Sequence, residues 1–223
     1  MRVLIIIPAY NEEKNIVRTM EDITTNLRNY DYLIVNDCSS DQTSEVLDSH
    51  RFSHIDLPIN LGLSGAVQTG YQYAYNKGYD CAVQFDGDGQ HQAKYISSMV
   101  NEIANGADIV IGSRFIDAKR SWGPRMLGSR ILSALIKLRT NQYIHDPTSG
   151  MRMLNRTMLH DYAFNINREP EPDTLVYEMN KGAQVKEIQV SMNNRLEGES
   201  MFSGFWPAFK YMMLQIVSII FLS

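Results

Sequence analysis

The sequence of 223 residues has too few cysteines for a disulfide scaffold, because only Cys38 and Cys81 are present. Each lies beside an apolar run typical of a β-strand, and residues 1–3 lead into another such run without a secretory leader. We therefore expect a reduced, cytoplasmic setting. No apolar run reaches the ~18 residues that span a bilayer, and the nearest, at residues 212–222, is interrupted by Gln215 and Ser218.

A strong net charge is also lacking: the value of -4 gives no reason to expect a nucleic-acid partner. Residues 60–66 read N-L-G-L-S-G-A, without G-x-G-x-x-G spacing or a G-K-[S/T] ending, which argues against a dinucleotide enzyme and a P-loop ATPase. A basic segment is present, however. Residues 114–139 hold one acid, Asp117, against Arg114, Lys119, Arg120, Arg125, Arg130, Lys137 and Arg139.

Composition and patterning predict one α/β domain. With 44% hydrophobic residues the chain can bury one sizeable core, and it is too short for two domains of ordinary size. Short β-branched runs alternate with segments of helical spacing, so we expect a mostly parallel central sheet with helices on both faces. The expected strands are residues 3–7, 32–36, 52–57, 81–85, 109–112 and 184–190, and the expected helices are residues 12–27, 43–49, 63–76, 94–105, 124–139 and 174–181.

Polar residues follow three of the expected strands, at the edge where parallel sheets bind ligands. Asp86 and Asp88 lie two apart, so in an extended backbone both carboxylates point the same way, which suits Mg²⁺ or Mn²⁺. The alternative is a polar turn, since Asp and Gly are common turn residues. His91 is either a further metal ligand, a phosphate contact or a solvated side chain. Asp37 either accepts hydrogen bonds from a ribose or base, or caps the next helix, the role favoured for Asp41.

Six motifs occur together in a recognisable order. They are residues 6–13 (I-I-P-A-Y-N-E-E), 35–41 (V-N-D-C-S-S-D), 60–62 (N-L-G), 86–91 (D-G-D-G-Q-H), 112–115 (G-S-R-F) and 146–150 (D-P-T-S-G). Each is weak alone, but in this order they resemble the family 2 glycosyltransferases of the GT-A fold. The likeness is greatest to the branch of dolichol-phosphate mannosyltransferases and bacterial polyprenyl-phosphate glycosyltransferases. It implies a Rossmann-like GT-A domain over residues 1–203, and the aromatic and apolar pattern of residues 204–223 predicts an amphipathic helical tail after it.

The resemblance also implies a reaction and assigns residues to it, motif by motif. The reaction is the inverting transfer of a hexose or N-acetylhexosamine from a nucleoside-diphosphate sugar, with a UDP-sugar favoured over a GDP-sugar. The implied nucleotide-sugar contacts are Pro8, Ala9, Tyr10, Glu12, Asp37, Gly62 and Asp86, the ligands of Mg²⁺ or Mn²⁺ are Asp86, Asp88 and Gln90, and the catalytic residues are Asp88, Arg114 and Arg195.

The chain departs from the family pattern at two places. Asn36 precedes Asp37 where relatives usually carry two acids, which weakens the case for base recognition by this motif. Gln92 and Ala93 replace a proline pair that usually follows the histidine. Neither departure removes an implied metal ligand.

The basic segment favours a phosphate acceptor. A phosphate monoester has its second pKa near ~6, so it is already a nucleophilic dianion and needs cations rather than a general base. We expect a polyprenyl (undecaprenyl) phosphate, used for cell-surface glycan synthesis. A solvated basic helix face is the alternative explanation of the segment. The expected acceptor contacts are Arg114, Arg125, Arg130 and Ser149.

Apolar residues within 124–139 and aromatic residues within 205–213 are typical of helices that lie on a membrane surface. We expect peripheral association with the inner face of the cell membrane, through lipid or a small membrane protein, and allow for a homo-oligomer. Packing of both helices on the body of the protein explains the same apolar residues equally well.

Two rival functions remain open at this stage. A transferase that acts on a sugar hydroxyl of a growing polysaccharide would need a general base, for which Asp173 or Glu171 are the available carboxylates. A catalytically silent subunit would bind nucleotide and recruit a membrane partner through residues 204–223.

Overall fold

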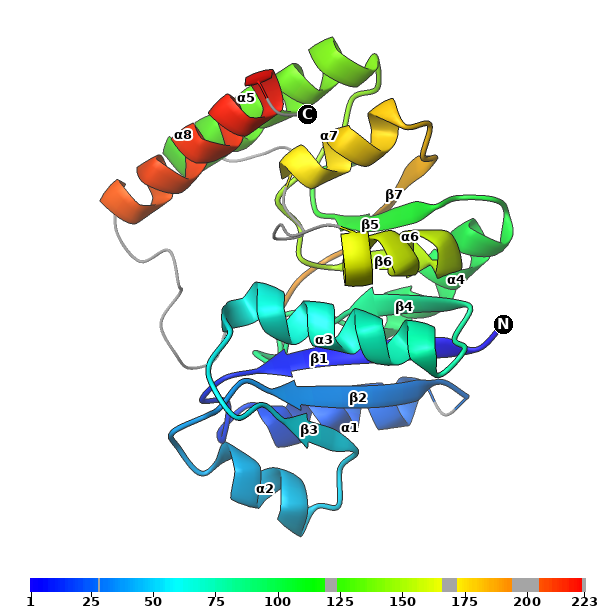
Figure 1. The fold of residues 1–223 in the computed structure, drawn as a ribbon, viewed down its shortest axis with the longest axis vertical. Coiled ribbons are helices and arrows are strands. Elements are labelled where there is room, and N and C mark those ends of the chain that lie inside the picture. The colour runs from blue at the N-terminus through cyan, green and yellow to red at the C-terminus, as the bar shows by residue number, and fades with distance from the viewer. Residues whose placement is uncertain (28, 119–123, 166–171, 194–204, 222–223) are drawn as a thin grey trace.

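The computed structural model describes the chain except for residues 28, 119–123, 166–171, 194–204 and 222–223. Its centre is a seven-stranded sheet with strand order β3-β2-β1-β4-β6-β5-β7 (Figure 1). Neighbouring strands are parallel except at β6, which is antiparallel to both β4 and β5. The strands are β1 (Val3–Ala9), β2 (Asp31–Asn36), β3 (His54–Asp56), β4 (Cys81–Gln84), β5 (Ile109–Ser113), β6 (Arg152–Asn155) and β7 (Val185–Gln189).

Helices cover both faces of the sheet, which confirms the α/β prediction. Every residue of β1 is buried, and its side chains alternate between the faces: Ile6 packs in the same cluster as Tyr71, and Ile5 in the cluster of Met20. The helices are α1 (Ile16–Asn26), α2 (Thr43–Ser49), α3 (Gly62–Asn76), α4 (Ile96–Ala104), α5 (Pro124–Thr140), α6 (Arg156–His160), α7 (Pro172–Asn180) and α8 (Phe205–Phe221), with short helical segments η1 (Ala93–Tyr95) and η2 (Asp161–Asn165).

Strand β6 was not predicted from the sequence. Its four residues read R-M-L-N and begin with a charge, so they do not resemble a buried strand. The guanidinium of Arg152 is nevertheless buried. It donates to the carbonyl of Pro147 at 2.6 Å and to that of Ser149 at 3.1 Å. These bonds satisfy the charged side chain and hold the preceding loop against the sheet.

The start of α1 lies several residues after the predicted one, whereas α2 begins at the predicted Thr43. Helix α1 begins at Ile16 rather than at Glu12, because the Glu12 carbonyl accepts the amides of Asn15 and Ile16 in a preceding turn. The residue before α2 is Gln42, yet the carboxylate of Asp41 accepts the Thr43 amide at 2.9 Å. The cap chemistry expected of Asp41 is therefore present, one residue further from the helix.

Helices α5 and α8 lie side by side at the end of the molecule opposite α2 (Figure 1). Helix α7 also packs against both of them. None of the helices in the described part of the chain combines the length and the apolar character needed to cross a bilayer.

Candidate active site

The carboxyl ends of β2, β1 and β4 lie next to one another at one edge of the sheet. The amide of Asp37 donates to the carbonyl of Ala9 at 2.9 Å, which joins the ends of β1 and β2. The Asp37 side chain is buried and its Oδ1 accepts the amide of Leu61 at 2.7 Å, just before α3. Three segments far apart in sequence thus meet at Asp37.

Asn36 braces the loop that follows β2. Its Nδ2 donates to Oδ1 of Asp56 at 2.6 Å, and its Oδ1 accepts the hydroxyl of Ser39. An amide can donate and accept at once, whereas a second carboxylate here would only accept. The departure from two acids therefore has a structural role, and it leaves Asp37 as the acid at this strand end.

The loop after β1 is fastened to the loop after β2. Asn11 has a positive φ of 56° and its Oδ1 accepts the Ser40 amide at 2.8 Å. Glu12 accepts Nδ2 of Asn15 at 2.7 Å, and its amide donates to Thr43. Tyr10 is exposed between these anchored residues, so its ring is free of the core and can meet a planar ligand.

Asp86 is held by neighbours that orient its carboxylate. Nε2 of Gln84 donates to Oδ1 at 3.0 Å, and Nε2 of His91 lies 3.6 Å from Oδ2. A Cβ built at Gly150 would lie 3.1 Å from Oδ2, so this glycine leaves the room that the carboxylate occupies. Support of this kind around a carboxylate is typical of metal sites, where outer partners fix the direction of the ligand.

Asp88 lies in a turn rather than in the extended backbone that the sequence argument assumed. Its Oδ1 accepts the amide of Gln90 at 3.0 Å, and Gly89 takes a positive φ of 75°. The carbonyl of Gln90 in turn accepts the amide of Asn193 at 2.9 Å. The carboxylates of Asp86 and Asp88 are both partly exposed at the edge of the sheet. Their directions are set by the turn and not by an extended strand.

The donor set suits a hard divalent cation bound together with a ligand. Asp86 and Asp88 supply carboxylate oxygens, which Mg²⁺ and Mn²⁺ prefer, and such ions often take only one or two protein carboxylates. Among the described residues, no cage of three or more acidic, histidine or cysteine side chains is formed. The remaining ligands of a cation here would come from water and from phosphate oxygens.

His91 is buried, so the interpretation of it as a solvated side chain is wrong. The ring is buried against Phe85, with ring centroids 5.4 Å apart. Its Nδ1 accepts the amide of Asp86 at 2.9 Å, so the ring proton of the neutral imidazole is on Nε2, facing the Asp86 carboxylate. His91 is a positioning residue for Asp86.

We expect His91→Phe to keep the packing against Phe85 but to raise the Mn²⁺ concentration for half-maximal activity about tenfold, because Asp86 loses its support. His91→Asn, whose side-chain oxygen can accept the Asp86 amide, should restore part of the affinity. A Mn²⁺ titration of activity measures both. His50→Phe, at the exposed end of α2, is the control, and an unchanged titration in His91→Phe would contradict the positioning role.

Arg114 is paired with a buried carboxylate. Its Nε and Nη2 donate to Asp146 at 2.6 and 2.8 Å, and its backbone amide donates to the same carboxylate at 3.1 Å. Burial lowers the pKa of Arg114, but the Asp146 carboxylate outweighs that effect and raises the pKa above its ordinary value. Three of the five guanidinium N–H groups are left for a phosphate, and the ion pair fixes their direction.

The loop of residues 146–150 is bonded to both of its neighbouring strands. The amide of Asp146 donates to Oε1 of Glu187 on β7 at 2.9 Å, and the hydroxyl of Ser149 donates to the Gly112 carbonyl on β5 at 2.6 Å. The Ser149 hydroxyl is buried in this bond, so its observed role is to hold the loop. The acceptor contact expected of Ser149 stays a prediction.

The other predicted residues are spread around this edge. Pro8 lies beneath Gly87, its carbonyl 3.1 Å from a Cβ built there, and Gly62 takes a positive φ of 76° with open space around it. Arg130 lies half-buried on α5. The side chain of Arg125, and Arg195 and Glu171 as a whole, lie outside the described residues.

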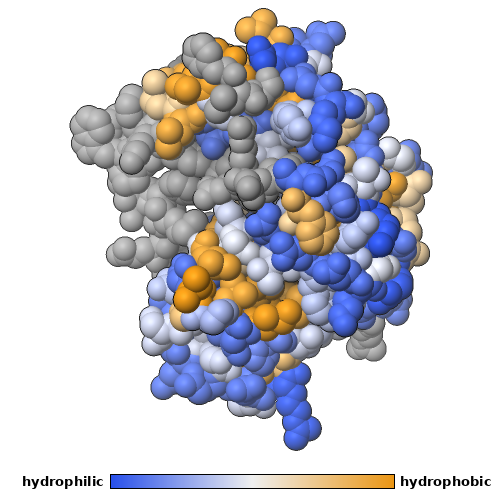
Figure 2. Space-filling view, in the orientation of Figure 1, coloured by the Kyte–Doolittle hydropathy of each residue, from blue (hydrophilic) through white to orange (hydrophobic). Residues whose placement is uncertain are grey.

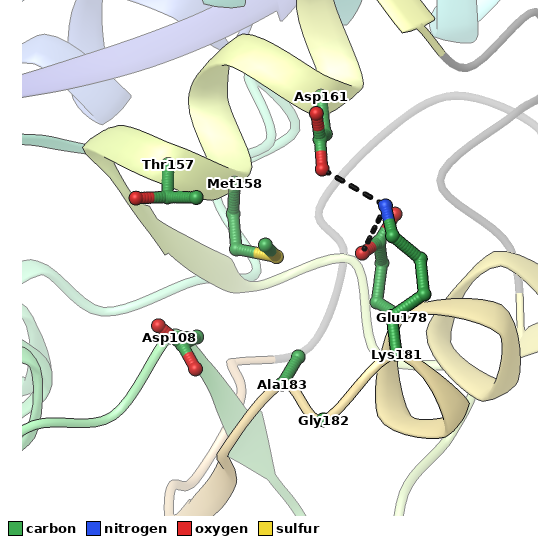
Figure 3. A pocket seen from close by; sticks show the side chains of 8 residues that line it. All are labelled: Asp108, Thr157, Met158, Asp161, Glu178, Lys181, Gly182 and Ala183. Atoms are coloured by element: carbon green, nitrogen blue, oxygen red, sulfur yellow. Dashed lines mark hydrogen bonds and ion pairs between the residues drawn. The ribbon is translucent and has the colours of Figure 1, made fainter.

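A separate hollow of about 260 Å³ lies near the opposite end of β5 (Figure 3). Nζ of Lys181 bridges Asp161 at 3.1 Å and the buried Glu178 at 3.3 Å within it. Burial raises the pKa of Glu178. None of the predicted site residues lines this hollow, which is lined by Asp108, Thr157, Met158, Asp161, Glu178, Lys181, Gly182 and Ala183.

Comparisons with known proteins agree with this geometry. A family model described as "Glycosyl transferase family 2" matches residues 4–163. The chain is 28% identical to the polyprenol monophosphomannose synthase of Mycolicibacterium smegmatis, covering 91% of this chain and 82% of that one. It is 32% identical to the UDP-N-acetylglucosamine–dolichyl-phosphate N-acetylglucosaminyltransferase of Methanococcus voltae, over 70% of each chain.

Solved structures share the fold. The glucosyl-3-phosphoglycerate synthase of Mycobacterium tuberculosis, crystallised with Mn²⁺, UDP-glucose and phosphoglyceric acid, superposes with a TM-score of 0.73. The match covers 100% of this chain and 81% of that one, at 14% sequence identity. The arrangement of strands and helices is therefore common to both, at an identity that shows the fold alone.

Proposed function

Because the chain belongs to glycosyltransferase family 2, we propose that it transfers a sugar from a nucleoside-diphosphate sugar to a polyprenyl phosphate, with inversion at the anomeric carbon. Its similarity to transferases named for polyprenol, undecaprenyl and dolichyl phosphates supports the acceptor class. The observation that carries the proposal is the strand edge itself, where Asp37 follows β2 and the pair Asp86 and Asp88 follows β4, on either side of β1.

Each residue has a task in this reaction. Asp37 accepts hydrogen bonds from the nucleoside, with the exposed ring of Tyr10 beside it. Asp86 and Asp88 would hold Mg²⁺ or Mn²⁺, and such an ion would supply positive charge to offset that of the diphosphate. An oxygen of the acceptor phosphate forms the new bond to the anomeric carbon, while the bond from that carbon to the diphosphate oxygen breaks. Arg114 and the basic residues of α5 offset the repulsion between the two phosphate groups.

The environment of Asp173 favours a phosphate acceptor over a sugar hydroxyl. A hydroxyl acceptor would need a general base. Of the two predicted candidates, Asp173 lies within the described residues and Glu171 does not. Its carboxylate is buried and accepts the Ser218 hydroxyl from α8 and the Thr174 amide at 2.8 Å. These bonds tie Asp173 to the packing of α7 and α8, whereas a phosphate dianion needs no base at all.

Incubation with labelled donor and two acceptors tests the proposal. With Mn²⁺ present, we expect labelled product on undecaprenyl phosphate and none on a lipid-linked glycan that offers only sugar hydroxyls. A UDP-sugar is the first donor to try, since the Methanococcus relative is named for one, and GDP-sugars complete the panel. Product on the glycan alone would replace our proposal with the hydroxyl-acceptor function.

We further propose that the enzyme works at the inner face of the cell membrane, where a nucleotide sugar and a lipid phosphate meet. The relatives act, by name, on phosphates of membrane lipids. A peripheral position would bring the strand edge to the headgroup of the acceptor.

A further inference from the structure

Two buried side chains of opposite charge hold the loop of residues 146–150. The side chain of Glu187 on β7 is 8% exposed, and Arg152 on β6 is 3% exposed. Both residues pair with Ile111 of β5, one from each side, so the three side chains lie in one row on the same face of the sheet. The loop is therefore held from both sides of the strand that leads to Arg114.

Glu187 binds the beginning of the loop through N–H groups. Its Oε1 accepts the amide of Asp146 at 2.9 Å, and its Oε2 accepts the amide of His145 at 2.7 Å. Nδ1 of His145 lies 2.9 Å from the same Oε2. These bonds fix the backbone at Asp146, whose own carboxylate accepts three N–H groups of Arg114. Glu187 thus acts on the direction of Arg114 through one intermediate residue.

Arg152 binds the second half of the loop through carbonyl groups. Its Nη2 donates to the carbonyl of Pro147 at 2.6 Å, and its Nε donates to that of Ser149 at 3.1 Å. Gly150 follows directly, and a Cβ built there would lie 3.1 Å from Oδ2 of Asp86. The backbone that Arg152 holds is therefore the surface against which the Asp86 carboxylate packs.

The charges of these two side chains are explained by the loop and not by the sheet. A charge out of water is costly unless hydrogen bonds replace those that it made with water. Between the two charged residues, β5 carries the fully buried Ile111, so an apolar residue suits this row of the sheet. An apolar side chain could not bind the amides and carbonyls of the loop, whereas Glu187 and Arg152 do so.

We infer that Glu187 and Arg152 are positioning residues that act on two different parts of the site. Glu187 sets the direction of the Arg114 guanidinium, and Arg152 sets the place of the Asp86 carboxylate. The inference rests on the proposed function, in which Arg114 faces the acceptor phosphate and Asp86 faces the metal ion. A loop held at both ends keeps these two groups at one separation, which fixes how the acceptor phosphate meets the donor.

Two substitutions at each position test the inference. Glu187→Met and Arg152→Met replace the charge with an unbranched apolar side chain, whereas Glu187→Gln and Arg152→Lys keep part of the hydrogen bonding. The Glu187 variants should raise the KM for undecaprenyl phosphate, about tenfold for Met and less for Gln, with Mn²⁺ affinity unchanged. The Arg152 variants should weaken Mn²⁺ binding, about tenfold for Met and less for Lys, with that KM within about twofold of the parent value.

Two measurements separate these effects. Mn²⁺ binding in the presence of UDP is followed by the electron paramagnetic resonance signal of the free ion, which requires neither acceptor nor turnover. KM for the acceptor is measured at saturating Mn²⁺ and donor. A variant that only lost stability would contain less folded chain and show a lower kcat, but the KM and the Mn²⁺ affinity of the folded fraction would not change.

Exposed residues on two other helices provide matched controls. Glu45→Gln on α2 and Arg18→Lys on α1 repeat the conservative substitutions on side chains that are exposed, and both should leave KM and Mn²⁺ affinity at the parent values. Figure 2 shows a mostly hydrophilic surface over α2, in the lower part of the molecule.

The inference is overturned if both Met variants keep the parent values of KM and Mn²⁺ affinity, or if variants at both positions change the two quantities equally. The proposed function is judged separately. Product on a sugar hydroxyl alone, together with weakened Mn²⁺ binding in the Arg152 variants, would count against the proposed acceptor and support the role of Arg152 at Asp86.

Discussion

The variant Asp88→Asn is expected to fold like the parent chain and to turn over about 10³-fold more slowly. Oδ1 of Asp88 accepts the Gln90 amide at 3.0 Å, and the side-chain oxygen of an asparagine can accept the same bond. The substitution therefore preserves the turn and removes the negative charge that a divalent cation needs. Steady-state turnover, measured over a range of Mn²⁺ concentrations with donor and undecaprenyl phosphate, reports the loss.

A carboxylate on the surface of α2 provides the control. Asp48→Asn removes a charge of the same kind where the side chain is 77% exposed, and turnover should stay within about twofold of the parent value. If Asp88→Asn retained full function in cells, and calorimetry showed donor binding without turnover on any acceptor, the chain would be a silent nucleotide-binding subunit.

The variant Asp146→Asn is expected to lower the melting temperature by roughly 10 °C, because breaking a buried ion pair costs about 3 kcal/mol or more. Asp146 is 0% exposed and accepts three N–H groups of Arg114. An asparagine offers one acceptor oxygen and turns an NH₂ group toward a guanidinium that can only donate. Thermal unfolding followed by circular dichroism measures the shift.

The ion pair of Asp161 with Lys181 gives a matched comparison, because its lysine is 46% exposed. Asp161→Asn should cost less than about 1 kcal/mol, as is usual for pairs in contact with solvent. Similar melting temperatures for the two variants would show that the Arg114 pair contributes no more than a surface pair does.

Most strands of the sheet could be predicted because each is an apolar run that is recognisable in the sequence by itself. β1 reads V-L-I-I-I-P-A and is buried throughout, so its apolar run alone identifies a central strand. β6 carries no such signal, since it becomes a strand through contacts with β4 and β5 and through carbonyls that satisfy Arg152. Short strands of this kind depend on tertiary context, which a local pattern does not contain.

The acids of the site were predictable, but their supports were not. Asp37, Asp86 and Asp88 follow strands and stand out by residue type and position. Asp146 meets Arg114 across 32 residues, and Gly150 lies near Asp86 across a still longer stretch of chain. Such contacts exist only after the chain has folded. His91 is close to Asp86 in sequence, but the burial of its ring could not be read from its neighbours.

Gly150 lies between the loop of residues 146–150 and the Asp86 carboxylate, and only its backbone separates them. A methyl group at this position would come within 3.1 Å of Oδ2 of Asp86 and 3.3 Å of Nε2 of Gln84. The loop that contains Asp146 and Gly150 therefore packs directly against Asp86, with no side chain of Gly150 between them. A side chain at position 150 would therefore require the Asp86 carboxylate and the Gln84 amide to move by a few tenths of an ångström, so the backbone of this loop helps to set where the Asp86 carboxylate lies.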